Sequence, residues 1–210
     1  MAKTKTIKPL DTSTEEKIKQ AAKVVFTTKG YAAARTRDIA EEAGINLALL
    51  NYYFRSKERL FQIVMLESLQ TFFSSMIVVL NDEELSFEKK VQGFVDRYIT
   101  LFQAQPELPF FVVSELNNHP DIFLKEMKVK DVIFKSSFIK ELQARMAANP
   151  RLKGVNPIQM MVNLSSMVIF PFAGAPFIRQ IGQFKDKEFD QLMEERKALI
   201  PGWFMGMLNT

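Results

Sequence analysis

Residues 46 to 57 combine a helical spacing of apolar side chains with groups that could contact the edges of nucleic-acid bases. Leu50 and Phe54 stand one helical turn apart, so both would face the interior of a small domain. A step of about 100° per residue then places Tyr52 on the opposite face, with Asn51 beside it. An asparagine amide can hydrogen-bond an adenine edge, and a tyrosine hydroxyl can reach a phosphate. This spacing indicates a helix that reads double-stranded DNA.

The same face carries small and apolar residues that are unusual on a solvated helix. Ala48 would allow close approach to a base edge, and Leu49 could contact the methyl group of a thymine. Tyr53 and Lys57 could reach phosphates, although Tyr53 could instead pack in the small core and Lys57 could be an ordinary solvated lysine. The expected DNA contacts are Arg35, Thr36, Arg37, Asn46, Leu47, Ala48, Leu49, Asn51, Tyr52, Tyr53 and Lys57.

Three helices are expected to hold this face in place. The first begins at a capping box in residues 13–16 and stops at Lys29-Gly30. Its inward positions recur at helical spacing and are Ile18, Ala21, Ala22, Val25 and Phe26. A second helix should run from residue 35 or 36 to 43, where Gly44 permits a sharp turn before a third helix capped by Asn46. Two short helices around a glycine turn predict a helix-turn-helix.

The rest of the chain is predicted to form longer and more apolar helices separated by proline and glycine. They are expected at about 57–81, 86–104, 107–118, 121–148, 156–180 with breaks at its prolines, and 186–208. Because strand-like alternation is almost absent, the fold is predicted to be all-α with about nine helices. The predicted domains are a basic flexible tail at 1–11, a helix-turn-helix domain at 12–60 and a larger helical domain at 61–210.

Charge is distributed unevenly along the 210 residues, whose net charge is +4. Residues 1–60 hold 12 Lys and Arg against 7 Asp and Glu, whereas residues 61–210 hold 16 against 17. A basic module joined to a neutral one suits a polyanionic partner, because neutralising phosphates releases condensed counterions. The lysine-rich tail could enter a neighbouring minor groove, although tails of this kind are more often solubilising.

The sequence lacks the residues that common catalytic and metal sites need. It has no cysteine and a single histidine, His119, which excludes disulfides, thiolate metal sites and histidine clusters. It also lacks a Glu-x-x-His pair, a Gly-x-Ser-x-Gly motif and a phosphate-cradling loop. We therefore expect neither an enzyme nor a cofactor or metal. The N-terminus has no apolar signal segment, so a cytoplasmic protein is expected.

One uncharged stretch is long enough to span a bilayer. It runs for 25 residues, from Gly154 to Ile178. Its prolines and amides, among them Pro171 and Asn163, are costly in a helix that faces lipid. We therefore expect a helix buried against protein and no membrane partner.

The larger domain has an adaptable apolar interior suited to a small molecule, since 17 of 19 phenylalanines and 10 of 11 methionines lie beyond residue 60. The expected ligand contacts, each of which could also be an ordinary core or helix-end residue, are Phe73, Met76, Phe94, Tyr98, Phe102, Phe111, Glu115, Asn118, Phe138 and Asn163. Apolar residues of the last two long helices exceed the needs of one monomer, which predicts a homodimer. The expected interface residues are Met160, Leu164, Met167, Val168, Leu192, Leu199, Trp203 and Met207.

Two segments resemble the N-terminal domain of the TetR family of repressors. They read TRDIAEEAGIN at 36–46 and LLNYYFRSKERL at 49–60, within a resemblance that spans roughly residues 14 to 61. Where the family usually has Thr-Thr or Thr-Ser, this chain has Ala34-Arg35, so phosphate contacts would pass to Thr36 or to the charge of Arg35. Where many members have Leu-Tyr, it has Leu50-Asn51. Residues 62–210 match only by length and helical pattern.

The resemblance implies a ligand-responsive transcriptional repressor. Such a protein would bind a palindromic DNA operator as a dimer and would be released by a small apolar or aromatic effector. The alternative is a helical small-molecule-binding or interaction protein whose helix-turn-helix is vestigial.

Overall fold

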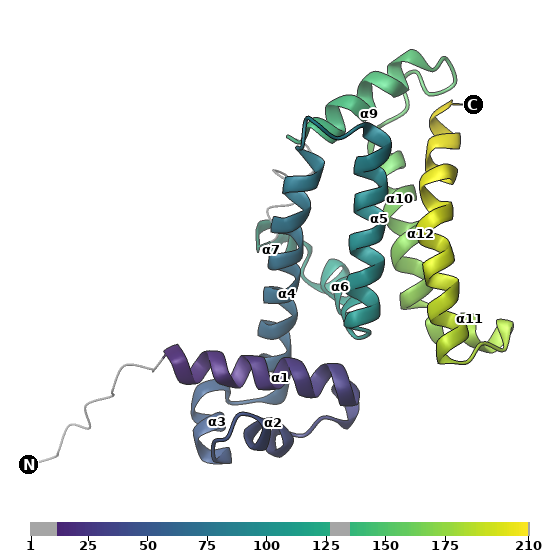
Figure 1. Ribbon diagram of the computed structural model, residues 1–210. Coiled ribbons are helices and arrows are strands. Elements are labelled where there is room, and N and C mark those ends of the chain that lie inside the picture. Colours follow the sequence, from purple (N-terminus) through teal and green to yellow (C-terminus); the bar gives the residue numbers. More distant parts are fainter. Residues whose placement is uncertain (1–11, 127–134, 210) are drawn as a thin grey trace, which may run out of the picture. The chain divides into compact units, whose positions relative to one another are not determined.

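The computed structural model describes residues 12–126 and 135–209, and every regular element in these ranges is a helix (Figure 1). The predicted all-α fold is confirmed. Eleven helices occur in the described ranges rather than about nine, because the predicted helices at 121–148 and 156–180 are each interrupted. The chain divides into two compact units, Met1–Glu67 and Ser68–Thr210, here called the first and second units. The predicted tail at 1–11 lies outside the described residues.

The first unit contains three helices and the beginning of a fourth. Their bounds are α1 Thr12–Ala33, α2 Thr36–Glu42, α3 Leu47–Phe54 and α4 Lys57–Leu80. All five residues predicted to face inward on α1 are buried. Gly30 has φ 72° and ψ 159°, so the predicted stop is a kink within α1 rather than its end. Gly44 adopts φ +65° between α2 and α3, a left-handed conformation that a residue without Cβ reaches at little cost.

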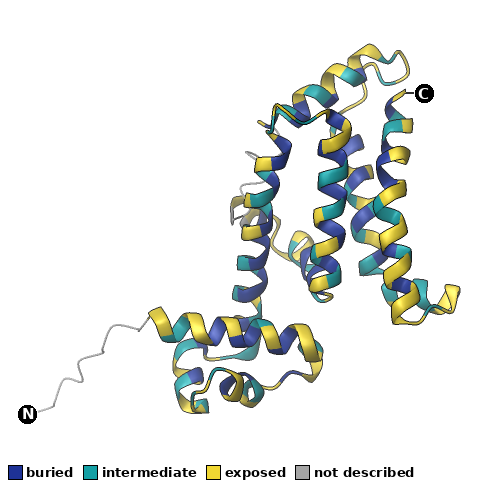
Figure 2. Cartoon of the chain, viewed as in Figure 1, coloured by how far each residue is buried: buried dark blue, intermediate teal, exposed yellow. Residues whose placement is uncertain are grey.

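The second unit contains the remaining helices. Their bounds are α5 Phe87–Ala104, α6 Leu108–Asn118, α7 Pro120–Glu126, α9 Ser137–Ala148, α10 Ile158–Ala173, α11 Ala175–Gly182 and α12 Asp186–Asn209. Helices α5 and α12 pack side by side, and buried residues recur along one side of each (Figure 2). The predicted helix at 121–148 is wrong as a single element, because Ser136 is extended and its hydroxyl accepts a hydrogen bond from the backbone of Ile139 to begin α9.

The uncharged stretch forms α10 and α11, which are bent by 72° relative to each other. The break falls at Gly174, whereas Pro171 lies inside α10. By length and composition, α4 alone and this bent pair could cross a membrane, but core helices of folded proteins meet the same criteria. One face of α10 is buried within the second unit through Met160, Met161, Leu164 and Val168. The stretch therefore contributes to a protein core.

Two helices contain an internal proline, and each has its lost hydrogen bond replaced from a neighbouring helix. A proline has no N–H, so the carbonyl four residues earlier is left without its helical donor. For Pro171 that carbonyl belongs to Met167, and it accepts a hydrogen bond from Arg196 Nη2 of α12 at 2.7 Å. For Pro201 it belongs to Lys197, and it accepts one from Gln92 Nε2 of α5 at 3.0 Å. These two bonds link α5 to α12 and α12 to α10.

A buried lysine links α5 to the beginning of α9. Lys90 is only 1 % exposed, and its ammonium donates to Glu141 Oε1 at 2.5 Å and to Ser137 Oγ at 3.0 Å. The Ser137 hydroxyl donates in turn to the carbonyl of Leu80 at the end of α4. A buried charge needs such partners, because losing its hydration is otherwise costly.

This network predicts unequal effects when its two charges are removed separately. Glu141→Ala should lower the free energy of unfolding by about 2 to 4 kcal/mol, because it leaves the buried Lys90 ammonium without its counterion. Lys90→Met should cost about 1 kcal/mol, since the Glu141 side chain is 38 % exposed and can be rehydrated. Urea unfolding followed by circular dichroism measures both values. A larger loss for Lys90→Met than for Glu141→Ala would contradict this account.

Candidate nucleic-acid interface

The orientation of α3 is set at its start and along its inner face. The side-chain oxygen of Asn46 accepts a hydrogen bond from the backbone N–H of Leu49 at 2.8 Å, which satisfies a donor that the first helical turn cannot. Leu50 and Phe54 are almost completely buried in the core of the first unit. The predicted cap and inner face are therefore confirmed. The Asn46 oxygen, predicted to contact DNA, serves the start of the helix.

The opposite face of α3 is exposed, as the spacing predicted. Ala48, Asn51 and Tyr52 are exposed, and Tyr52 is 57 % accessible despite its size. Leu47 and Leu49 lie at the edges of this face and are partly buried. Tyr53 is also partly buried, with its ring edge-to-face against Tyr52 at 5.6 Å between centroids. We call Ala48, Asn51 and Tyr52 the reading face.

The start of α2 adds positive charge. Arg35 and Arg37 are exposed, and Thr36 between them is partly buried. The Asp38 carboxylate accepts a hydrogen bond from the Arg35 backbone at 3.0 Å and pairs with Lys29 at 3.2 Å. The backbone bond first, and Lys29 second, hold the pKa of Asp38 below its usual value. The one acidic side chain in the first turn of α2 is thus engaged within the first unit.

Lys57 has partners that sequence reasoning missed. Its ammonium donates to the carbonyls of Tyr31 at 2.9 Å and Ala34 at 3.2 Å, and lies 4.3 Å from the centre of the Tyr31 ring. Both carbonyls follow the kink at Gly30, so Lys57 ties the beginning of α4 to the end of α1. The Tyr31 hydroxyl donates to Glu58 at 3.1 Å. The backbone N–H of Glu58, together with this hydroxyl, lowers the pKa of Glu58. Lys57 is therefore not an ordinary solvated lysine.

Residues 18–64, which include all of this geometry, match the family model of bacterial regulatory proteins, tetR family. This part of the chain is thus similar to bacterial regulatory proteins of the TetR family. The proteins that share this model, and the curated relative described below, are transcriptional regulators.

Proteins of known sequence or structure are similar over nearly the whole chain. YttP of Bacillus subtilis strain 168, a probable HTH-type transcriptional regulator, is 22 % identical over 197 residues, which are 91 % of this chain and 94 % of YttP. A TetR/AcrR-family regulator of Thermobifida fusca YX-ER1 has a TM-score of 0.59 at 17 % identity, covering 91 % of this chain and 97 % of its own. FadR of Bacillus subtilis, solved with stearoyl-CoA, has a TM-score of 0.53 at 15 % identity, covering 89 % and 97 %. These likenesses extend the shared fold to the second unit.

Some of the predicted ligand contacts form one aromatic cluster in the second unit. The ring of Tyr98 lies 4.6 Å from Phe94 and 5.6 Å from Phe102 on α5, and 4.3 Å from Phe72 on α4. Burial raises the pKa of the Tyr98 hydroxyl. Phe73 joins the cluster through Phe72. We call these five rings the α5 aromatic cluster. Met76 and Phe111 are also buried in the second unit.

Other predicted ligand contacts lie elsewhere. Phe138 stacks on Phe87 at 4.8 Å in a separate aromatic group. Glu115 lies 3.4 Å from the imidazole of His119, which is exposed. Asn118 and Asn163 are exposed as well, and the Asn163 amide contacts the sulfur of Met207. The contacts described for these residues are with groups outside the α5 aromatic cluster.

The structure instead shows a buried polar residue at the end of α5 that sequence reasoning missed. Gln105 is 8 % exposed, and its Oε1 is buried without a hydrogen-bond partner. It stands three residues after Phe102 of the α5 aromatic cluster. An unpaired buried acceptor is costly and uncommon. A polar residue within an aromatic stripe is the sequence signal that could have singled it out.

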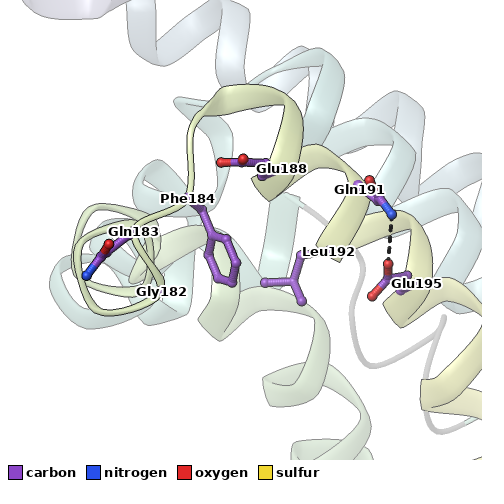
Figure 3. Close-up of a pocket in the computed structure, with 7 residues that line it drawn as sticks. All are labelled: Gly182, Gln183, Phe184, Glu188, Gln191, Leu192 and Glu195. Atoms are coloured by element: carbon purple, nitrogen blue, oxygen red, sulfur yellow. Dashed lines mark hydrogen bonds between the residues drawn. The ribbon is translucent and has the colours of Figure 1, made fainter.

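A hollow of about 330 Å³ lies where α11 turns into α12 (Figure 3). Its lining is largely polar: Gly182, Gln183, Phe184, Glu188, Gln191, Leu192 and Glu195. The Phe184 ring lies against Gly182, where a Cβ would come within 2.1 Å of it. With two carboxylates in its wall, this hollow does not resemble the apolar ligand site that the sequence predicted.

The predicted dimer residues divide into two groups. Met160, Leu164 and Val168 are almost completely buried within the second unit, so they have little surface to offer a second chain. Leu199 and Trp203 are 46 % exposed, and Met167, Leu192 and Met207 are partly exposed. The exposed apolar residues of α10 and α11 are others, namely Ile158, Val162, Phe170, Phe177 and Ile181. The predicted face of α10 is therefore corrected, because the helix is apolar on both sides and its inner side packs on the protomer.

The contacts of Lys57 predict a stability effect that is independent of DNA. Lys57→Met should lower the free energy of unfolding by about 1 to 2 kcal/mol, because the carbonyls of Tyr31 and Ala34 lose a charged donor. Arg59→Met, a change to an exposed charge in the same helical turn, should alter it by less than about 0.5 kcal/mol. Chemical denaturation of the two variants measures the difference. Equal free energies of unfolding for the two variants would show that the contacts of Lys57 with these carbonyls do not stabilise the fold.

Proposed function

We propose that this protein is a repressor that binds a palindromic operator as a dimer and is released by a small apolar or aromatic effector. The observation that carries the proposal is the reading face of α3, kept exposed because Leu50 and Phe54 hold the opposite side in the core. Such a protein would act in the cytoplasm, as expected of bacterial DNA-binding regulators.

The reading face supports direct contact with bases. In the major groove, an asparagine amide can bond both the acceptor and the donor of an adenine edge, which suits Asn51. Ala48 has no side chain beyond Cβ that would hold the helix away from the bases. Tyr52, Arg35 and Arg37 would contact phosphates, which fix the register without reading sequence. Lys57 stays a predicted phosphate contact, now from a position braced by two carbonyls.

Exposed apolar side chains support a dimer. Residues of this kind occur on α10, α11 and α12, and the largest are Phe170, Phe177 and Trp203. A monomer rarely exposes many large apolar residues on consecutive elements unless they bind a partner. A two-fold contact would bury the same residues from both copies and would present two reading faces to the two halves of a palindrome.

The effector is proposed to lie beside the α5 aromatic cluster and Gln105. Aromatic walls with few polar groups suit a small apolar molecule, and the unpaired Gln105 oxygen suits one that donates a hydrogen bond. A protein of similar fold, FadR of Bacillus subtilis, was solved in complex with stearoyl-CoA, a molecule with a long apolar acyl chain. Helix α4, which begins in the first unit and ends in the second, would connect the two sites. Release requires the effector to prefer the state that does not bind DNA, and the operator must then weaken effector binding by the same factor.

Mutations of Asn51 and Tyr52 should impair DNA binding in different ways. Asn51→Ala should relax discrimination at one base pair by about 1 to 3 kcal/mol, because a bidentate contact is lost. Tyr52→Phe should weaken binding by about 1 kcal/mol at every sequence, because only a phosphate contact is lost. Fluorescence anisotropy with a duplex selected from a random-sequence library, and with its single-base variants, measures both effects.

The control for this experiment is Gln143→Ala, which removes an exposed amide from the second unit and should leave binding unchanged. For wild-type protein, affinity should also fall steeply with salt, since several phosphates are contacted. If folded Asn51→Ala and Tyr52→Phe proteins both bound like wild type, the reading face would be wrong. If no duplex bound at low salt, the helix-turn-helix would be vestigial.

We expect Gln105 to contribute to effector binding while lowering the free energy of unfolding. Gln105→Leu removes a buried acceptor without a partner at nearly constant volume, so the free energy of unfolding should stay the same or rise by about 1 kcal/mol. In a screen of small aromatic alcohols and amines, any compound that releases wild-type protein from DNA should act more weakly on this variant. Phe102→Leu, the matched core control, should destabilise. A loss of stability for Gln105→Leu would instead assign Gln105 a structural role.

A further inference from the structure

Arg196 connects a defect in the backbone of α10 to an exposed aromatic side chain of α12. Its guanidinium donates to the Met167 carbonyl at 2.7 Å, the carbonyl that Pro171 leaves without a helical donor. The same guanidinium lies 5.4 Å from the centre of the Trp203 ring. Arg196 and Trp203 stand seven residues apart, so two turns of α12 place them on one side.

The contacts of Arg196 within the second unit are few and directional. Its Nε is buried and has no acceptor, so the Met167 carbonyl and the Trp203 ring are the groups that orient the guanidinium. Burial lowers the pKa of Arg196, but a guanidinium remains charged at neutral pH. A charged, oriented plane beside an indole restricts the rotations of that indole.

Trp203 is well placed to anchor a second copy of the chain. It is the only tryptophan, it is 46 % exposed, and Leu199 one turn earlier is equally exposed. Tryptophan and arginine are the residues that most often dominate the binding energy of protein interfaces. An anchor that is already held in its bound orientation loses less entropy on association.

We propose that Arg196 is a positioning residue of the dimer, which holds Trp203 on the surface that a second copy of this chain covers. The proposal rests on the dimer of the proposed function and assigns its anchor. A second copy is the occupant that the surface favours. Large exposed apolar residues occur on α10, on α11 and, through Leu199 and Trp203, on the later half of α12, and a two-fold axis would pair them with the same residues of the other copy.

Gln92 provides a matched control within the same unit. It also binds a carbonyl that a proline leaves free, that of Lys197, but it lies on α5 and makes no ring contact with Trp203. Loss of either side chain removes one hydrogen bond to a proline-freed carbonyl. Only loss of Arg196 also removes the support of Trp203.

The test compares Arg196→Met, Trp203→Ala, their double mutant and Gln92→Met by sedimentation equilibrium, with Trp203 fluorescence as a local readout. Arg196→Met should raise the dimer dissociation constant about tenfold, which corresponds to about 1.4 kcal/mol. It should also increase quenching of Trp203 by acrylamide in the monomer. Trp203→Ala should weaken the dimer at least as much, and the two effects should not add in the double mutant. Gln92→Met should leave the dissociation constant unchanged.

A second pair of variants keeps the test decisive if Arg196→Met folds poorly. Pro171→Ala restores the N–H for the Met167 carbonyl, so Arg196→Met should cost less stability in that background than in wild type. Arg196→Lys keeps a hydrogen-bond donor but loses the planar guanidinium. Acrylamide should therefore quench Trp203 in this variant nearly as strongly as in Arg196→Met, and more strongly than in wild type. A wild-type protein that stays monomeric at micromolar concentration would overturn the proposed dimer itself. A wild-type dimer whose dissociation constant is unaffected by Arg196→Met, or by Trp203→Ala, would overturn this inference alone.

Discussion

The burial of Leu50 and Phe54 is the interaction on which the proposed DNA binding depends. These two side chains fix the rotation of α3 about its own axis, and the rotation decides which residues face outward. A turn of the helix by one residue, about 100°, would bring apolar Leu50 to the surface and take Asn51 off the outward face. Apolar packing on the inner side of α3 therefore selects the groups that are proposed to contact DNA. The cap at Asn46 limits sliding of the helix along its axis in the same way.

Much of the first unit could be predicted because its signals are local. The spacing of the buried residues on α1, the glycine turn at Gly44 and the cap of α3 each depend on residues within a turn or two of one another. The role of Lys57 could not be predicted, because its partners are carbonyls at positions 31 and 34. Those carbonyls become available only through the kink at Gly30 and the packing of α1 beside α4. The spacing of residues in the sequence does not predict such a tertiary contact.

The second unit shows where periodicity fails. Helix α10 has apolar residues on all sides, so its sequence does not indicate which side faces the core. The choice is made by packing on its neighbours, and it places Leu164 inside and Val162 outside. Phe138 stacks on Phe87 rather than joining the α5 aromatic cluster, and periodicity does not indicate which of several aromatic groups a phenylalanine joins. A glutamine after a helix is usually solvated, so its position after the aromatic residues of α5 is a weak signal, and the structure shows that Gln105 is buried.

The hydrogen bonds at the prolines of α10 and α12 provide a way for a displacement of one helix of the second unit to move the next. An internal proline costs a helix about 3 kcal/mol, and part of this cost is offset when another group supplies the missing hydrogen bond. Here the donors come from other helices, Gln92 of α5 for α12 and Arg196 of α12 for α10. Each donor makes the geometry of one helix depend on the position of the next. A shift of α5, whose aromatic residues lie in the proposed effector site, would thus reach the exposed surface of α10 and α12 through directional bonds. Apolar packing alone would allow these helices to slide, whereas a hydrogen bond to a fixed carbonyl tolerates little displacement.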